Sequence, residues 1–208
     1  MLFRSPEFRT SLIPVGLLPD APEIAQRMHR AASRAGVGPM AAVAGAIAQM
    51  AAEAALAAGA REAIVENGGD TYLVSPEEVT VALYAGVTAL AGQLAFRVSP
   101  EEMPLSICSS SGRMGHSLSL GDCDLATVVS ADASLADAVA TRAGNLVRTA
   151  ADLQLAGQQL VAIEGVTGVV LVRDGRVALA GRLPELVRNR DPHTRQKITR
   201  DERSGPVP

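Results

Sequence analysis

One short stretch of the chain, residues 108–117 (CSSSGRMGHS), gathers the side chains best suited to bind a phosphate or another anion. Consecutive small residues expose backbone N–H groups and hydroxyls, and an arginine can add charge-assisted hydrogen bonds to the same group. The histidine could act as a donor or an acid–base group, or could pair with Cys108 as a nucleophile. A polar surface loop with an incidental histidine explains the same composition. The candidate ligand-binding residues are Ser110, Ser111, Gly112 and Arg113, and the candidate catalytic residue is His116.

A second candidate lies in residues 134–141 (SLADAVAT), where Asp137 and Thr141 are four residues apart. A helix places both on one face. A carboxylate and a hydroxyl are hard oxygen ligands that suit Mg²⁺ together with waters and a phosphate. The alternative is a capping box, because Ser134 and Asp137 have the spacing with which side chains satisfy backbone donors at a helix start.

Two further stretches contain small residues that would let a ligand approach the backbone. Residues 67–70 (NGGD) lie between two apolar runs, and glycine tolerates the positive φ angles of a tight hairpin. The same turn could instead be a place where a ligand approaches, with an amide and an acid beside it. Gly45 lies in a run of small residues at a helix start, which could equally serve close helix packing. The candidate ligand-contacting residues are Gly45, Asn67, Gly68, Gly69 and Asp70.

The composition limits the classes of function. The chain has 208 residues, 48% of them hydrophobic, which suits one globular domain with a core that needs no disulfide. A net charge of −3 and an aromatic content of 2% argue against nucleic acid as the main partner. Lys197 is the only lysine and lies close to the C-terminus, so we expect no catalytic lysine in the folded body.

The N-terminal sequence and the cysteines predict where in the cell the protein is located. The first 16 residues lack the long apolar core and cleavage site of a signal peptide, and the two cysteines suit reduced thiols, so we expect a cytoplasmic protein. The apolar stretch 40–60 is mostly alanine and is interrupted by Gln49 and Glu53. We therefore expect a buried helix that crosses the core rather than a membrane span.

The elements that must position these residues follow from periodicity and turn signals. We expect a helix that is capped by Asp20 and ends at Gly36, and a second helix over 39–58. A loop is expected over 100–119, and a helix from 134 to 162 with a break at 144–145. The expected strands are 62–66, 71–74, 79–84, 93–98, 125–130, 168–172 and 176–180, the last two joined by an Asp-Gly type I′ turn. Residues 1–187 form a single domain on this interpretation, and 188–208 form a polar, flexible tail.

Four of these motifs, in this order, resemble the ApbE-type flavin transferases, which are magnesium-dependent enzymes that move FMN from FAD onto protein threonine or serine. The motifs are the helix start VAGA, the turn NGGD, the loop SSG with a following histidine, and the helix ADAVAT. The chain is more closely similar to a short ApbE-like family, through VGPMAAVAGAIAQ, VENGGDTYL, CSSSGRMGHSLSLGDCD and LADAVATRAGN. This resemblance covers residues 8–185. It also implies further sequence before residues 6–8, with an additional edge strand.

The resemblance implies an α+β fold in a duplicated, T-fold-like arrangement, with mostly antiparallel sheets packed on helices. It implies that Asp137 and Thr141 hold Mg²⁺ and that residues 110–112 contact the phosphate or ribose of FAD or a related nucleotide. The implied activity is FMN transfer or cleavage of the FAD pyrophosphate. A non-catalytic flavin- or nucleotide-binding sensor on the same scaffold is the alternative, and a homo-oligomer that assembles through the alanine-rich helix is a third hypothesis.

The chain also departs from the transferases. They carry Lys-Gly at the helix start, where this chain has Ala44-Gly45. Their histidine is followed by an Asp-Pro-x-x-Gly element, whereas here His116 is followed by SLSLG. We therefore expect a small-molecule nucleotide ligand with a metal more firmly than transfer of the flavin to a protein, and we expect neither a nucleic acid nor a membrane partner.

Overall fold

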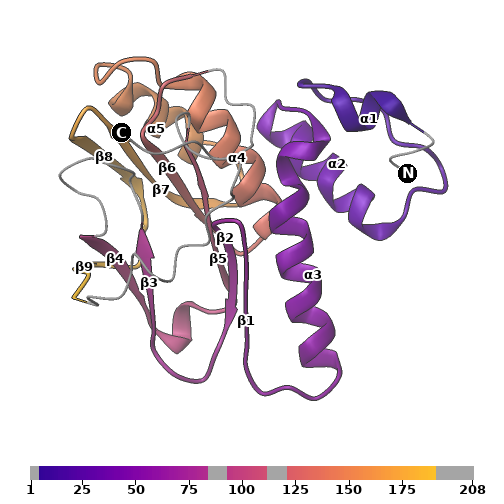
Figure 1. Cartoon of the computed structure of the whole chain (residues 1–208), viewed down its shortest axis with the longest axis horizontal. Coiled ribbons are helices and arrows are strands. Elements are labelled where there is room, and N and C mark those ends of the chain that lie inside the picture. Colours follow the sequence, from indigo (N-terminus) through magenta and orange to yellow (C-terminus); the bar gives the residue numbers. More distant parts are fainter. Residues whose placement is uncertain (1–4, 84–92, 112–120, 191–208) are drawn as a thin grey trace, which may run out of the picture.

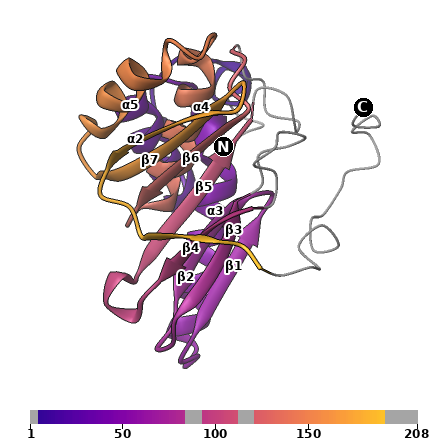
Figure 2. The same cartoon turned by 90° about the vertical axis from the view of Figure 1, so that its left-hand side faces the viewer.

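A computed structural model describes residues 5–83, 93–111 and 121–190, and it shows three layers. Helices cover one face of a six-stranded sheet, and a small three-stranded sheet covers the other face (Figures 1 and 2). One core cluster joins the helices to the first face, and a second joins the two sheets through side chains such as Leu73, Phe96 and Val129. The fold is thus mixed α+β, as predicted.

The large sheet is antiparallel throughout and has the order β1-β2-β5-β6-β7-β8. Its strands are β1 (Ala63–Asn67), β2 (Asp70–Val74), β5 (Leu105–Ser110), β6 (Leu125–Ser130), β7 (Val166–Arg173) and β8 (Arg176–Gly181). The small sheet has the order β3-β4-β9, with β3 (Val79–Leu83), β4 (Leu94–Val98) and β9 (Glu185–Arg188).

The helical layer begins with α1 (Pro6–Thr10) and α2 (Glu23–Ala35). A 3₁₀ turn, η1 (Pro39–Ala42), leads into α3 (Val43–Ala57), and a second, η2 (Pro100–Glu102), precedes β5. The helices α4 (Ala133–Leu146) and α5 (Leu153–Val161) follow β6. α2 and α3 lie on one side of Figure 1, and α4 packs over β5 and β6.

The expected loop over 100–119 is wrong in its middle, because β5 is a strand in the centre of the large sheet. The hydrophobic alternation in LSICSS is limited to Leu105 and Ile107, which is too short to signal a strand. Neighbouring strands satisfy the polar groups. The Ser106 hydroxyl donates to the Ser130 carbonyl at 2.7 Å, and the hydroxyls of Ser109 and Thr127 lie 2.9 Å apart.

Two helix boundaries also differ from the expectation. α2 ends at Gly36 in the left-handed conformation, as expected, but its N-cap is Pro22 rather than Asp20. The expected break at 144–145 is wrong, because these residues lie inside α4 and the helices separate over 147–152. There the Asp152 carboxylate accepts hydrogen bonds from the backbone amides of Arg148 and Thr149, which closes the turn.

The hairpin β7–β8 confirms the predicted turn, since Asp174 and Gly175 have φ angles of 49° and 72°. Strand β9 was not anticipated. It pairs with β4, and the Glu185 carboxylate forms an ion pair with Arg97 at 2.9 Å.

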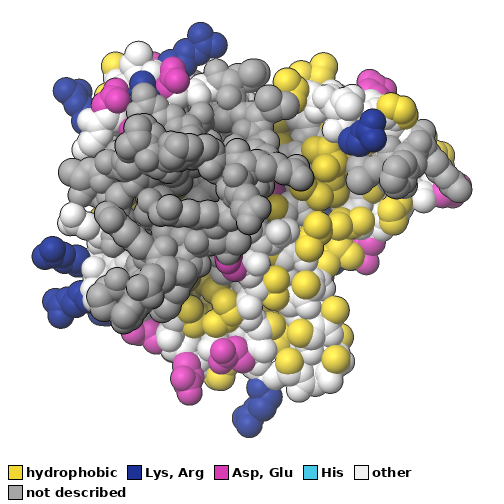
Figure 3. Space-filling view, viewed as in Figure 1, with side chains coloured by type: hydrophobic (Ala, Val, Ile, Leu, Met, Phe, Trp, Pro, Cys, Tyr) yellow, Lys and Arg dark blue, Asp and Glu magenta, His cyan; other side chains and the backbone are white. Residues whose placement is uncertain are grey.

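The expectation that the long alanine-rich helix crosses the core is wrong. The most apolar window of Pro39–Ala57 is only 28% buried, and Ile47 is 45% exposed. Figure 3 shows apolar side chains gathered over α3 and the helices beside it. Pro39–Ala57 is long and apolar enough to cross a bilayer by length and composition (mean hydropathy 1.5), a test that helices of soluble proteins also pass.

Candidate functional site

The candidate site lies where the starts of α3 and α4 meet the ends of β2 and β5. Asp70 is the first residue of β2 and is paired with Cys108 of β5. Tyr72 and Cys108 both belong to the core cluster beneath the helices. Because side chains alternate along a strand, Asp70 points to the same side as Tyr72, toward the helical layer. The sheet therefore presents a carboxylate and a thiol beneath α4.

Gly45 allows α3 to approach the start of α4 closely. A Cβ at this position would lie 2.2 Å from the Ala133 carbonyl oxygen and 2.9 Å from the Asp137 Cβ, so no other residue fits without moving a helix. The Gly45 backbone amide donates to Asp137 Oδ2 at 3.0 Å. The Asp137 carboxylate thus satisfies a free N–H group in the first turn of a neighbouring helix.

The capping-box alternative for residues 134–137 is wrong. The N-cap of α4 is Asp132, whose carboxylate accepts the Leu135 backbone amide at 3.2 Å. The Ser134 hydroxyl is buried and has no hydrogen-bond partner among the described residues. Asp137 therefore does not cap its own helix, and its contact with α3 was not foreseen.

Two carboxyl groups of the site, those of Asp70 and Asp137, have raised pKa values and are difficult to ionise together. Asp70 is 6% exposed, and burial, with a further contribution from the charge of Glu66, raises its pKa to about 7. The Cys108 thiol and the Ser109 amide lower the pKa in part. Its Oδ1 atom has no hydrogen-bond partner within the described part of the chain. Burial, followed by the charge of Asp70, raises the pKa of Asp137 well above its ordinary value.

The remaining predicted ligands fall into two groups. Thr141 is half-buried one helical turn after Asp137, on the same side of α4. Ser110, two residues beyond Cys108 on β5, is 9% exposed, and its hydroxyl has no partner among the described residues. Ser111 directly follows the strand and is half-buried. Gly112, Arg113 and His116 lie outside the described residues.

The turn at 67–70 is a two-residue hairpin between β1 and β2. Asn67 and Asp70 are directly paired, and Gly68 and Gly69 have φ angles of 66° and 102°. No atom lies within 4 Å of a Cβ built on Gly68, so its φ angle rather than crowding requires glycine. The Asn67 amide donates to the Ala44 carbonyl at 3.2 Å, which fastens the hairpin to the start of α3.

Cys108 is the site residue whose position sequence reasoning missed. Its thiol lies 3.5 Å from the Ala133 carbonyl oxygen, and burial together with the charges of Asp70 and Asp137 raises its pKa well above the ordinary value. A thiol that stays protonated is a poor nucleophile, which argues against a reactive pair with the histidine. Recognition of β5 as a strand next to β2 would have placed it beside Asp70.

This arrangement can hold a hard divalent cation. The carboxylates of Asp70 and Asp137, with the Thr141 hydroxyl one turn away, are oxygen donors of the type that Mg²⁺ prefers, and Mg²⁺ keeps several waters or phosphate oxygens as further ligands. The described residues contain no group of three histidine, cysteine, aspartate or glutamate side chains that would form a closed metal site.

Comparison with known proteins confirms the resemblance suggested by the motifs. The family model described as AbpE bacteria matches residues 2–169. A UPF0280 protein of Methanocella arvoryzae is 46% identical over 185 residues, which cover 89% of this chain and 75% of that protein. A UPF0280 protein of Archaeoglobus fulgidus is 44% identical over 191 residues, with 89% and 77% covered.

Solved structures show a similar fold at low sequence identity. The ApbE protein of Thermotoga maritima superposes with a TM-score of 0.53 at 14% identity, over 70% of this chain and 51% of that one. The flavin transferase ApbE of Vibrio cholerae gives a TM-score of 0.50 at 15% identity, over 70% and 50%. The chain thus spans about half the length of these solved structures, and the likeness concerns the fold.

Proposed function

We propose that this chain, which belongs to the AbpE bacteria family, is a magnesium-dependent protein that binds FAD or a related phosphate-containing nucleotide and acts on its pyrophosphate. The observation that carries the proposal is the buried pair of Asp70 and Asp137, in which burial raises the pKa of both carboxyl groups and the charge of Asp70 raises that of Asp137 further. A cation beside the pair would favour the charged forms, so binding of the metal and loss of protons go together. Such pairs occur at functional sites more often than in ordinary cores.

The similarity of the fold to that of a flavin transferase suggests which nucleotide binds. The similar Vibrio cholerae protein is described as a flavin transferase, and we infer that this chain uses the same class of ligand. As part of the same proposal, the two sheets and their helices form the duplicated, T-fold-like arrangement of those proteins. The low aromatic content of 2% predicts that phosphate and metal contacts, rather than ring stacking, supply most of the affinity.

In this proposal each candidate site residue has its own role. Asp137 and Thr141 hold the cation, and Asp137 is kept in place by the Gly45 amide. Ser110, Ser111 and Gly112 donate hydrogen bonds to phosphate or ribose, with Arg113 as a charged donor. His116 gives or accepts the proton at the reacting oxygen. When bound, Mg²⁺ would supply positive charge that stabilises the negative charge that develops on the phosphate oxygens.

Asp70 completes the site from the sheet side. Its Oδ1 atom has no hydrogen-bond partner among the described residues and would be a further oxygen donor for the cation. In the absence of metal its pKa of about 7 means that it carries a proton for part of the time at neutral pH. We infer that the proton leaves when the metal and nucleotide bind.

The reaction at the pyrophosphate has two versions. In both, an acceptor oxygen forms a bond to the phosphorus of the FMN half while the bond to the AMP oxygen breaks, and the acceptor proton passes to a base such as His116. A protein hydroxyl as acceptor gives flavin transfer, and water gives FMN and AMP.

A titration of FAD fluorescence tests the proposal. FAD is expected to bind in the presence of Mg²⁺ and at least tenfold more weakly after chelation. Asp137→Asn, which can still accept the Gly45 amide, is expected to lose the metal dependence, whereas the exposed Asp20→Asn serves as the matched control. Equal metal dependence in Asp137→Asn and the parent chain would contradict the proposed site.

A further inference from the structure

A polar pocket of about 270 Å³ lies on the helical side of the molecule, apart from the carboxylate pair. It opens between α2, α3 and the first residue before α4. At about 30 Å³ for each water in the liquid, it has room for about nine waters or for a small organic molecule. The residues that line it are Glu23, Arg27, Arg30, Gln49, Glu53 and Asp132.

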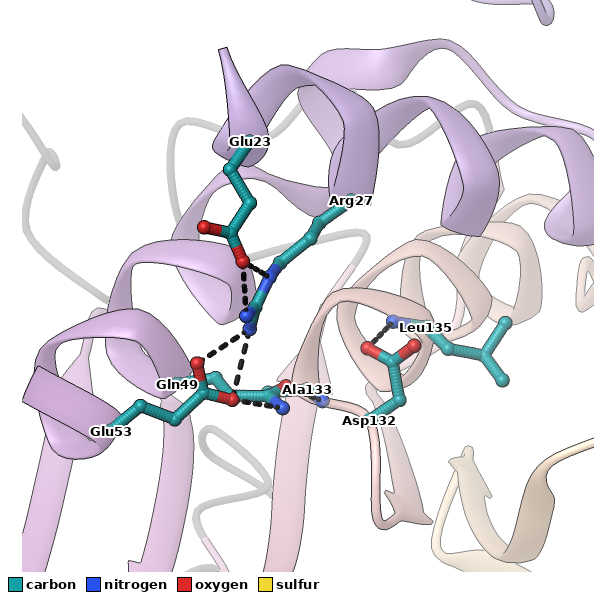
Figure 4. A network of polar contacts seen from close by, with 7 residues as sticks. All are labelled: Glu23, Arg27, Gln49, Glu53, Asp132, Ala133 and Leu135. Carbon is teal, nitrogen blue, oxygen red and sulfur yellow. Dashed lines mark hydrogen bonds and ion pairs between the residues drawn. The ribbon is translucent and has the colours of Figure 1, made fainter. Parts of the chain in front are cut away.

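Ion pairs and hydrogen bonds connect the side chains that line this polar pocket (Figure 4). Arg27 forms ion pairs with Glu23 at 2.6 Å and with Glu53 at 2.8 Å. Gln49 donates to the Glu53 carboxylate at 2.9 Å and accepts the Ala133 backbone amide at 2.8 Å. These contacts join all three helices, so the pocket is formed before any ligand arrives and binding requires little ordering.

Close to the polar pocket, although not part of its lining, is a tyrosine hydroxyl without a hydrogen-bond partner among the described residues. Tyr72 on β2 is 5% exposed, and the charges that act on its phenol belong to Glu53, Arg27 and Asp132, all of them in the pocket wall. Within residues 5–83, 93–111 and 121–190 its hydroxyl has no hydrogen-bond partner. A phenol hydroxyl both donates and accepts, so this one is free to bond to a ligand that reaches it.

The charges of the polar pocket indicate the class of ligand. Glu23 and Glu53 are both engaged by Arg27. In contrast, Arg30 has no ion pair among the described residues, and the carboxylate of Asp132 accepts only the Leu135 amide there. One guanidinium and one carboxylate of the lining, both on exposed residues, therefore remain outside the ion pairs of the pocket wall.

We propose that the polar pocket binds a small zwitterion, a molecule that carries one ammonium group and one carboxylate as a free amino acid does. Asp132 receives the ammonium group, Arg30 receives the carboxylate, and the Tyr72 hydroxyl bonds to one of the two. The Ala133 amide bonds to Gln49 in the pocket wall, while the Ala133 carbonyl lies against Cys108 of the candidate site. The two sites are thus neighbours but share none of these ligand-binding side chains.

The test is a thermal-shift and calorimetric screen of the full chain against the common L-amino acids, with ethylammonium chloride and sodium acetate as single-charge probes. At least one amino acid is expected to bind, and both single-charge probes are expected to bind about tenfold more weakly or worse, because each loses one charge-assisted contact. Failure of every amino acid to bind overturns the proposal. Equal binding of ethylammonium or acetate overturns the assignment to a zwitterion.

Three variants locate the binding. Arg30→Met and Asp132→Asn, in which asparagine still caps α4, are each expected to weaken the best amino acid about tenfold. Tyr72→Phe is expected to cause a smaller loss. Arg61→Met is the matched control, because Arg61 is exposed and lies outside the pocket. Unchanged affinity in both Arg30→Met and Asp132→Asn would place the ligand elsewhere and refute the site.

Discussion

Replacement of Asp70 by asparagine is expected to stabilise the protein at about pH 8 and to remove part of its dependence on pH. The pKa of this carboxyl is raised from 3.8 to about 7, mainly because it is buried. A pKa difference of this size corresponds to a penalty of about 4 kcal/mol for the ionised form. Asparagine has the same shape and can still accept the Ser109 amide, but its NH₂ group needs a partner of its own. A net gain of about 1 to 3 kcal/mol in the free energy of unfolding is therefore expected.

The sign follows from the protons that each state binds. Below about pH 4 the carboxyl of Asp70 is protonated in both the folded and the unfolded chain, so it makes no difference to stability. As the pH rises toward 7, the unfolded chain loses this proton first, and the parent protein loses stability relative to the variant. Above about pH 7 the difference is constant. Removal of the Asp70 charge also eases ionisation of Asp137, which adds to the gain.

The assay is urea unfolding of the parent and Asp70→Asn proteins at a series of pH values between about 3 and 9, with and without Mg²⁺. Without metal, the two free energies are expected to diverge between about pH 4 and 7. With metal, the parent is expected to recover part of the difference, because a ligand that binds only the folded state stabilises it. Parallel curves, or a variant that is less stable at about pH 8, would show that Asp70 is not a destabilised carboxyl and would refute the reasoning.

The other predictions concern close contacts in the same region. Gly45→Ala is expected to destabilise the protein by about 1 to 3 kcal/mol in urea unfolding, because the added Cβ would collide with the Ala133 carbonyl, and a change below about 0.5 kcal/mol would contradict the close helix approach. Gly68→Ala is expected to cost about 1 kcal/mol through its positive φ angle alone, whereas a larger loss would indicate a steric contact that the structure lacks. Cys108 is expected to resist alkylation by iodoacetamide at about pH 8 until the protein is unfolded, and rapid labelling of the native state would contradict its burial.

Much of the fold could be predicted from the sequence, where hydrophobic periodicity and turn chemistry are strong. The Asp174-Gly175 turn, the end of α2 at Gly36 and the buried strand β6 all follow from local signals. β5 was missed because only Leu105 and Ile107 give it an apolar pattern, and the polar groups of its serines are satisfied by neighbouring strands.

The candidate site could likewise be predicted only where it depends on local sequence. The four-residue spacing of Asp137 and Thr141 correctly places them on one side of α4, since this depends only on helix geometry. The bond from Gly45 to Asp137 joins residues 92 apart, and the interaction of Asp70 with Asp137 joins a strand to a helix. Such contacts are set by tertiary packing, so no local pattern could predict them.

The central claim is that this chain cleaves the pyrophosphate of FAD with the help of a cation at Asp137. The most direct measurement is to incubate the purified protein with FAD, with and without Mg²⁺, and to separate FAD, FMN and AMP by chromatography. The account predicts that AMP is released only with Mg²⁺, together with free FMN or with flavin bound to protein, and that Asp137→Asn releases none while Asp20→Asn behaves as the parent. Tight binding of FAD without any release of AMP would contradict catalysis and favour a sensor or carrier, and absence of both binding and AMP would contradict flavin as the ligand.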